Sequence, residues 1–153
     1  MKTLYFDIDG TLLVNDGDAV KTELGAGKFE EAVRGAGFLR LVCVGNFASI
    51  AHAIKEIHAD YDAIGVLFRV CRGAFQDEAW LRSRTVLVTD PGNRANEIDL
   101  SGDWWYVDDL AEHYMHVAGR DCAFSANLGG RICTPAPLGD GRDVLEWLSN
   151  TVP

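Results

Sequence analysis

Short apolar runs alternate with amphipathic segments along the chain. These runs are rich in β-branched, aromatic or aliphatic residues, and most of them stop at glycine or acidic residues, which is typical of strands. They predict five strands, at residues 3–6, 39–44, 85–89, 104–107 and 122–125.

Helical periodicity is clearest directly after the second run. Apolar side chains recur there at the spacing of one helix face, at Phe47, Ile50, Ala51, Ile54 and Ile57. Asn46 stands where the N-cap of this helix is expected. Further helices are predicted over residues 28–37, through most of 62–84, at 110–119 and at 144–148. For residues 63–68 a strand stays open as the alternative, because periodicity does not decide a short apolar run.

The alternation of strands and helices determines the predicted fold class. It is typical of a doubly wound α/β protein with a parallel sheet. We therefore expect a Rossmannoid three-layer α/β/α fold with a mostly parallel five-stranded sheet. A chain of 153 residues fits one domain, spanning 1–153. The helix at 110–119 should bury Leu110, Tyr114 and Val117.

Composition narrows the classes of partner. The net charge is −9, which argues against nucleic acid because phosphate backbones need a basic surface. No apolar run approaches the ~20 residues that span a bilayer, which argues against a membrane partner. The first strand begins almost at once, leaving no room for a cleavable signal, so a cytoplasmic location is expected. The four cysteines lack Cys-x-x-Cys spacing and are predicted to be free, buried thiols.

Two carboxylates stand one residue apart where the first strand breaks. The string is Phe6-Asp7-Ile8-Asp9-Gly10-Thr11-Leu12, and residues i and i+2 of an extended strand point the same way. Two like charges so close repel unless a cation neutralises them or they share a proton. Asp7 and Asp9 therefore predict a metal site, an acid/base pair, or both. Solvated carboxylates at a strand-to-turn junction are the alternative.

A second acidic pair, Asp108-Asp109, follows the strand at 104–107. In open α/β sheets, ligands bind at the carboxyl ends of the strands, where this pair and Asp7 are both expected. Oxygen-only ligands suit Mg²⁺. Helix capping is the alternative explanation for Asp108 and Asp109, because aspartate favours the first turn of a helix.

The string Asp-x-Asp-Gly-Thr-Leu resembles the first motif of the haloacid dehalogenase-like (HAD) superfamily, and Asp108-Asp109 resembles its later acidic motif. The resemblance implies Mg²⁺-dependent phosphoryl transfer through an aspartyl-phosphate. Asp7 would be the nucleophile, and Asp9 the general acid/base with its backbone carbonyl on the metal. Asp108 would be a direct metal ligand and Asp109 a direct or water-mediated one.

Two positions depart from the family pattern. Gly45 stands where members usually carry Ser or Thr to bind the phosphoryl oxygens, so the backbone N–H groups and the amide of Asn46 would have to assist. The family also expects a Lys or Arg between the second strand and the later acidic pair, and Arg94 is the best placed. Three other arginines compete for this role: Arg69, Arg72 and Arg84.

The length of the connections predicts how a substrate reaches the site. The segment from about residue 10 to residue 27 is left for a small flap, with a turn at 15–18. None of the connections is long enough for a large cap domain. Such an open site admits a small or a larger phosphorylated molecule. Alternatively, a neighbouring subunit closes the site, so a homo-oligomer stays possible as a partner arrangement. The leading hypothesis is a phosphomonoester phosphatase. The alternatives are a phosphate- or metal-binding regulatory protein with little turnover, and a phosphotransferase.

Overall fold

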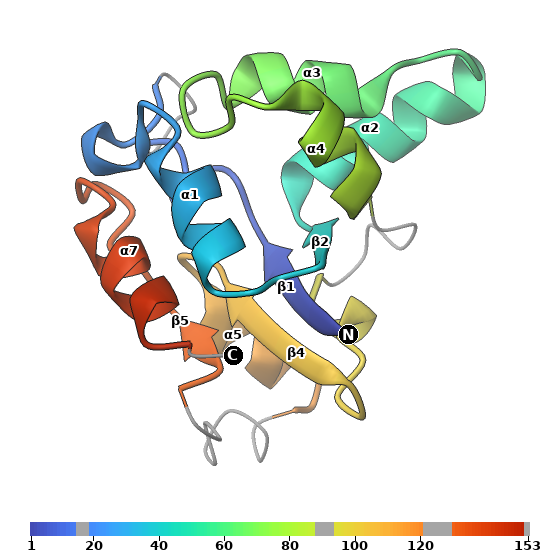
Figure 1. The fold of residues 1–153 in the computed structure, drawn as a ribbon. Helices are drawn as coiled ribbons and strands as arrows, with labels where there is room; N and C mark the ends of the chain where they lie inside the picture. The colour runs from blue at the N-terminus through green and yellow to red at the C-terminus, as the bar shows by residue number, and fades with distance from the viewer. Residues whose placement is uncertain (15–18, 88–93, 121–129, 152–153) are drawn as a thin grey trace.

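The computed structural model describes residues 1–14, 19–87, 94–120 and 130–151. Its sheet has five strands in the order β3-β2-β1-β4-β5, and every pairing is parallel (Figure 1). The strands are β1 (Lys2–Phe6), β2 (Arg40–Cys43), β3 (Thr85–Leu87), β4 (Asp103–Val107) and β5 (Ile132–Cys133). The predicted α/β class with a parallel five-stranded sheet is confirmed.

Strand β1 lies at the centre of the sheet, between β2 and β4, and all five of its residues are buried. Its apolar sequence follows from this position, because a central parallel strand is covered on both faces. Phe6 is paired with Cys43 on one side and with Val107 on the other. The three strand ends therefore meet at one edge of the sheet.

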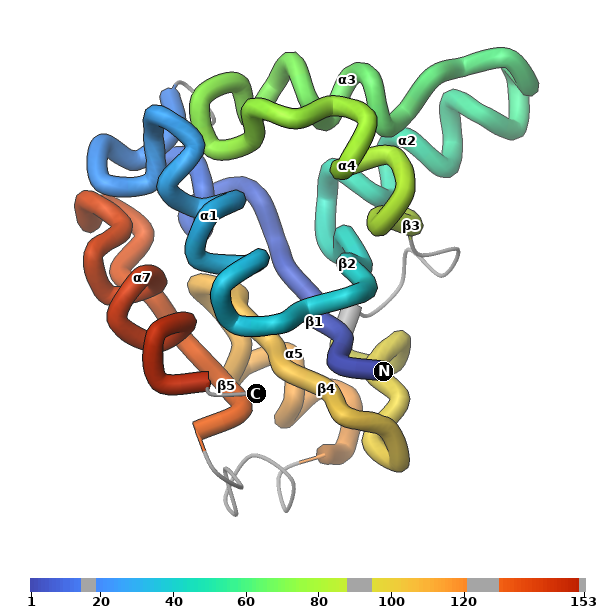
Figure 2. The backbone as a smooth tube through the Cα atoms, viewed as in Figure 1, coloured from blue at the N-terminus to red at the C-terminus, as the bar shows by residue number. Residues whose placement is uncertain are grey.

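Helices cover the two faces of the sheet. They are α1 (Lys28–Gly35), α2 (Asn46–Ile57), α3 (Ala63–Val70), α4 (Glu78–Arg84), α5 (Ala111–Val117) and α7 (Arg142–Ser149), with short 3₁₀ turns η1 (Thr22–Leu24) and η2 (Arg94–Glu97). Helices α1 and α7 lie side by side, and α5 lies on the other side of β4 (Figures 1 and 2). The described residues form no large cap domain, and none of their helices is long and apolar enough to cross a membrane.

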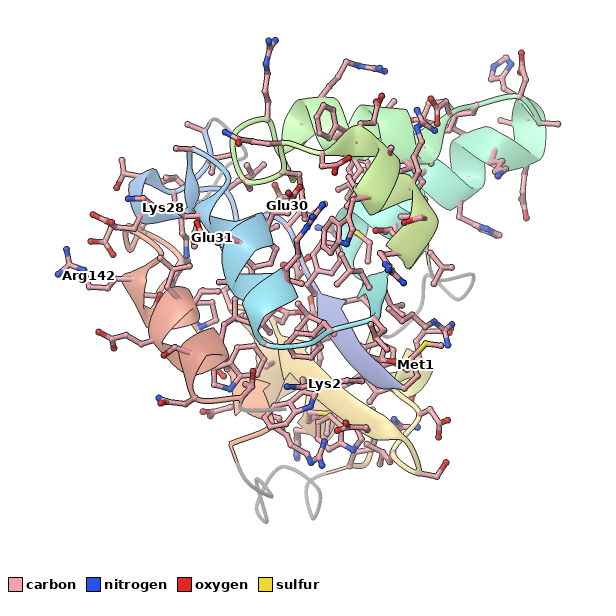
Figure 3. All side chains as sticks on the ribbon, viewed as in Figure 1. Met1, Lys2, Lys28, Glu30, Glu31 and Arg142 are labelled. Carbon is pink, nitrogen blue, oxygen red and sulfur yellow. The ribbon has the colours of Figure 1, made fainter. Side chains whose placement is uncertain are left out.

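An aromatic cluster joins β1 to α1 and to the connection between α3 and α4. The rings of Phe6, Phe29 and Phe75 lie with their centroids 5.5–6.5 Å apart. The buried carboxylate of Glu30 accepts hydrogen bonds from the backbone N–H groups of Gln76 and Asp77 and holds that connection against α1 (Figure 3). These contacts fix the segment that packs beside the end of β1.

Lys2 lies at the start of β1, at the amino end of the sheet (Figure 3). Its ammonium donates hydrogen bonds to the carbonyls of Ala36 and Thr151, at the ends of α1 and α7. The same group lies 4.7 Å from the ring centroid of Phe38 and 5.1 Å from that of Trp105. Backbone carbonyls at helix ends and aromatic faces both stabilise a cation, so this buried lysine has a structural role.

Two of the predicted helix faces are only partly right. In α2, Ala51 is buried and Phe47 and Ile54 are partly buried, as predicted, but Ile50 and Ile57 are exposed and Ala48 is buried instead. In α5, Tyr114 is partly buried, as predicted, but Leu110 and Val117 are exposed, and Ala111 and Met115 are buried. In both helices alanine lies on the buried face. The prediction gave most weight to the larger apolar residues.

The segments between the central strands test three further expectations. Residues 63–68 are helical within α3, so the helix predicted there is confirmed and the strand alternative is excluded. The strand predicted at 122–125 and the turn predicted at 15–18 fall outside the described residues, and β5 at Ile132–Cys133 was not predicted. Cys43, Cys71 and Cys133 are free thiols, as predicted; Cys43 and Cys71 are also buried, whereas Cys133 is only partly buried, and Cys122 falls outside the described residues.

Candidate metal and catalytic site

The order of the strands places two of the predicted acids side by side. The chain first runs from β1 to β2 and β3, and then crosses to β4 and β5 on the other side of β1. Asp7 directly follows β1, Asp108 directly follows β4, and the Asp7 N–H donates to the carbonyl of Val107 at 3.1 Å. Ligands of open α/β sheets bind at such a reversal of strand order.

Three carboxylates gather at this point. One oxygen from each of Asp7, Asp108 and Asp109 lies within 4.8 Å of the other two. Asp7 and Asp108 are buried, and Asp109 is half-buried. Burial raises the pKa of Asp109, and so do the charge of Asp108 and a hydrogen bond with it, while a hydrogen bond with Asp7 opposes the shift. The three acids are crowded enough to repel one another when ionised.

The donor set fits a hard divalent cation. All three side chains offer only oxygen, and Mg²⁺ is commonly held by one or two carboxylates together with water and a substrate phosphate. A cation between these carboxylates would offset their mutual repulsion. Asp7, Asp108 and Asp109 could therefore hold a metal ion in this structure, and its identity as Mg²⁺ stays a prediction.

Asp108 is fixed in place by both of its oxygens. Its Oδ2 accepts a hydrogen bond from the hydroxyl of Tyr106 at 2.7 Å, and its Oδ1 accepts one from the backbone N–H of Leu110 at 2.9 Å. The second bond belongs to the turn that leads into α5. The N-cap residue of that helix is Leu110, so neither Asp108 nor Asp109 caps it with its side chain, and the metal-ligand role of Asp108 stays a prediction. Tyr106 was not predicted as a site residue, although its spacing from Asp108 places both on one face of an extended chain.

Asp109 packs against the turn that follows β1. Its backbone N–H donates to Oγ1 of Thr11 at 3.0 Å. Gly10 has a φ of +78°, and a Cβ there would lie 2.7 Å from the Asp109 carboxyl carbon. Glycine at this position therefore allows both the left-handed backbone and the close approach of the carboxylate. The Gly-Thr of the first motif holds one acid of the later pair.

Asp9 lies apart from the three clustered acids. It is exposed, whereas Asp7 is buried, and it does not belong to the group of carboxylates that meet within 4.8 Å. Burial raises the pKa of the Cys71 thiol to about 12, and the charges of Asp9 and Asp7 add to the shift. Both carboxylates are therefore close enough to Cys71 to influence it. The acid/base role of Asp9 and its carbonyl contact with a metal stay predictions.

The segment after Asp7 folds back on itself. The N–H groups of Thr11, Leu12 and Leu13 all donate to the carbonyl of Ile8, which makes a tight turn. Leu13 then pairs with Val20 in an antiparallel bridge. We keep the name flap for residues 10–27, and its role in substrate access stays a prediction.

Gly45 and Asn46 lie at the same edge of the sheet, since the Val44 N–H donates to the carbonyl of Phe6 at 2.9 Å. Gly45 has φ +92° and ψ −160°, and it, rather than Asn46, is the N-cap residue of α2. The predicted N-cap is therefore wrong by one residue. Its backbone conformation also accounts for the glycine, because that region is open to almost no other residue.

We expect Gly45→Ser to destabilise the protein rather than to improve phosphate binding. The serine Cβ would be forced into a backbone region that costs about 1–3 kcal/mol for residues other than glycine. Chemical denaturation of the variant and its parent measures this loss. An unchanged free energy of unfolding would contradict the strain assigned to Gly45.

The predicted phosphate-binding arginine is only partly described. Arg94 opens η2, and its side chain falls outside the described part of the structure. The three rivals Arg69, Arg72 and Arg84 are exposed. The basic residue predicted from sequence is therefore not assigned. A lysine that was not predicted, Lys21, is buried, and its backbone N–H donates to the carbonyl of Leu12 in the turn that follows β1.

Two hollows lie away from these acids. One, of about 500 Å³, runs between α1 and α7 and is lined by Lys28, Glu31 and Leu145 among others; Figure 3 shows the two charged residues on α1. The other, of about 360 Å³, lies between α2, α3 and β3. Neither is lined by Asp7, Asp108 or Asp109. The acidic cluster is therefore identified by its charged side chains and its place at the strand ends, and not by either of these hollows.

Comparison of the chain with protein-family models, curated proteins and solved structures gave no match. The resemblance of residues 7–12 and of Asp108-Asp109 to HAD motifs therefore stays a prediction from the sequence. Function must be inferred from the acids themselves and from their place in the sheet.

Proposed function

We propose that this protein is a Mg²⁺-dependent phosphomonoester phosphatase of the HAD type, acting through an aspartyl-phosphate on Asp7. The observation that carries the proposal is the meeting of Asp7, Asp108 and Asp109 at the reversal of strand order. Their positions match the acids of the two motifs on which the family resemblance rests.

Each acid has a distinct task in the proposed reaction. A carboxylate oxygen of Asp7 attacks phosphorus, and the bond from phosphorus to the alcohol oxygen breaks. Asp9 gives its proton to that leaving oxygen, and then takes a proton from the water that attacks the aspartyl-phosphate. The bond between Asp7 and phosphorus breaks, which releases inorganic phosphate and restores both acids.

Asp108 and Asp109 serve the same reaction by holding the cation. Bound Mg²⁺ would offset the repulsion between the carboxylates and a phosphate dianion and stabilise the charge that develops during transfer. Tyr106 and the Leu110 N–H keep Asp108 in one orientation, and Thr11 positions Asp109. A fixed set of acids loses little freedom when it binds a cation and a substrate.

One observation supports the alternative of a phosphate- or metal-binding regulatory protein with little turnover. Gly45 cannot supply the hydroxyl that the family usually places beside the phosphoryl group, and its backbone conformation disfavours a serine at this position. Asp9 favours the enzyme, since binding alone does not need an acid/base. A phosphotransferase would use the same acids with an acceptor other than water.

The absence of a large cap among the described residues fits a phosphorylated substrate of either small or large size. The free thiols of Cys43, Cys71 and Cys133 suit a reducing compartment, so we place the protein in the cytoplasm. A homo-oligomer in which a neighbouring subunit covers the site stays an alternative.

A panel of phosphate monoesters, assayed with Mg²⁺ and with a chelator, tests the proposal. We expect release of inorganic phosphate that requires Mg²⁺ and is restored when the metal is added back. Mg²⁺ binding without release from any ester would favour the regulatory alternative, and transfer to an added alcohol would favour the phosphotransferase. Hydrolysis that proceeds equally well in the chelator would contradict the proposal.

A further inference from the structure

Lys21 is fully buried, which is rare for lysine unless its charge is paired. Its ammonium carries three donors, and one of them is used, in a 2.7 Å hydrogen bond to the carbonyl of Ala136. Among the described residues, no carboxylate forms an ion pair with it. A buried cation with donors to spare is costly unless negative charge nearby offsets it.

Lys21 and Asp109 both contact the turn that follows β1. The Lys21 N–H donates to the carbonyl of Leu12 at 2.9 Å. One residue earlier, Thr11 accepts from the N–H of Asp109, and the Asp109 carboxylate packs beside Gly10. Residues 10–12 therefore contact Asp109 and Lys21 in succession.

The segment after β5 connects Lys21 to Asp108. The carbonyl of Cys133 accepts from the Asp108 N–H at 3.1 Å, and the Ala136 carbonyl that holds the ammonium follows three residues later. The Glu23 N–H donates to the carbonyl of Asp140 at 2.9 Å, which ties the flap to the same segment. Lys21 thus lies between two segments that both contact the acidic pair.

Negative charge surrounds the ammonium at longer range. Burial lowers the pKa of Lys21, and the charges of Asp143 and Asp109 are the largest influences that raise it. Asp143 accepts a hydrogen bond from the N–H of Ala136, the residue whose carbonyl holds the ammonium. Asp109 is linked to Lys21 through the turn at residues 11 and 12, so a positive charge at Lys21 would act on an ion held by Asp109.

We propose that Lys21 is a positioning residue that supplies a fixed positive charge to the acidic site, an inference that rests on the proposed function. Its charge weakens the hold of the carboxylates on a divalent cation and favours an anionic phosphoryl group beside them. The flap would therefore add a positive charge beside the carboxylates. This charge comes from before the second strand, outside the stretch where the sequence resemblance places a basic residue.

Two neutral variants separate the charge of Lys21 from its hydrogen bond. Lys21→Met removes both, whereas Lys21→Gln removes the charge and keeps a donor for the Ala136 carbonyl. Lys28→Gln is the matched control, because Lys28 is exposed and faces Glu23 at 3.6 Å (Figure 3). Circular dichroism confirms that each variant is folded, and the glutamine variant alone suffices if the methionine variant unfolds.

Calorimetric titrations with Mg²⁺, and with inorganic phosphate at saturating Mg²⁺, measure the effect without turnover. Both neutral variants should bind Mg²⁺ about three- to tenfold more tightly and phosphate more weakly by a similar factor, while Lys28→Gln matches the parent. If Lys21 were purely structural, its replacement would not tighten metal binding.

Unchanged affinities in Lys21→Gln would overturn the role of Lys21 and leave the phosphatase proposal standing. The predicted shifts in a parent that hydrolyses no ester would support Lys21 and overturn the phosphatase. A parent that binds no Mg²⁺ would overturn both.

Discussion

Asp7→Asn is expected to lower Mg²⁺-dependent phosphate release by at least about 10³-fold, because an amide cannot act as the attacking carboxylate. Asparagine has nearly the same shape, and the hydrogen bond from residue 7 to the Val107 carbonyl uses only the backbone. The fold should therefore survive the change. Initial rates of phosphate release from the best ester of the panel measure the loss.

Asp103→Asn is the matched control for this experiment. Asp103 begins β4 at the opposite end from Asp108, and its carboxylate pairs with Arg131 at 3.0 Å near the surface. The same chemical change there should leave turnover within about twofold of the parent. Equal rates for Asp7→Asn and Asp103→Asn would remove Asp7 as the nucleophile.

Asp108→Asn is expected to weaken Mg²⁺ binding by at least about tenfold, since it removes one of the three negative charges of the acidic cluster. Asp108 is fully buried and held by Tyr106 and Leu110, so asparagine should occupy the same position without the charge. Calorimetry gives the affinity. Thermal unfolding gives a second measure, because a ligand that binds only the folded state raises the unfolding temperature.

The parent and Asp103→Asn should both gain thermal stability from Mg²⁺, and Asp108→Asn should gain little. Equal gains in all three proteins would show that the cation binds elsewhere.

Tyr106→Phe tests the hydrogen bond that holds Asp108. The variant keeps all three acids, so we expect a smaller loss of Mg²⁺ affinity than in Asp108→Asn.

Much of the sheet could be predicted because its strands are buried. The apolar runs at 3–6, 39–44 and 104–107 coincide with β1, β2 and β4 to within one residue at most ends, and nearly all side chains of these strands are buried. Strand β5 has only two residues, which is too short to give a pattern. Helix faces were less predictable, because buried alanines such as Ala48 and Ala111 carry a weak hydrophobic signal.

The gathering of Asp7 and Asp108 could be expected because the ends of neighbouring parallel strands meet at one edge. Their roles as nucleophile and metal ligand stay predictions. The exposure of Asp9 could not be foreseen, since the tight turn around the Ile8 carbonyl ends the extended chain. The burial of Lys21 had no sequence signal either, because it depends on contact with a segment more than 100 residues away.

Trapping the covalent intermediate tests the central claim most directly. The protein would be mixed with its best ester and Mg²⁺, quenched in acid, and mapped by mass spectrometry. We predict one added phosphoryl group on Asp7, absent when Mg²⁺ is chelated and absent in Asp7→Asn. A phosphoryl group on another residue, or full turnover by Asp7→Asn, would contradict the account.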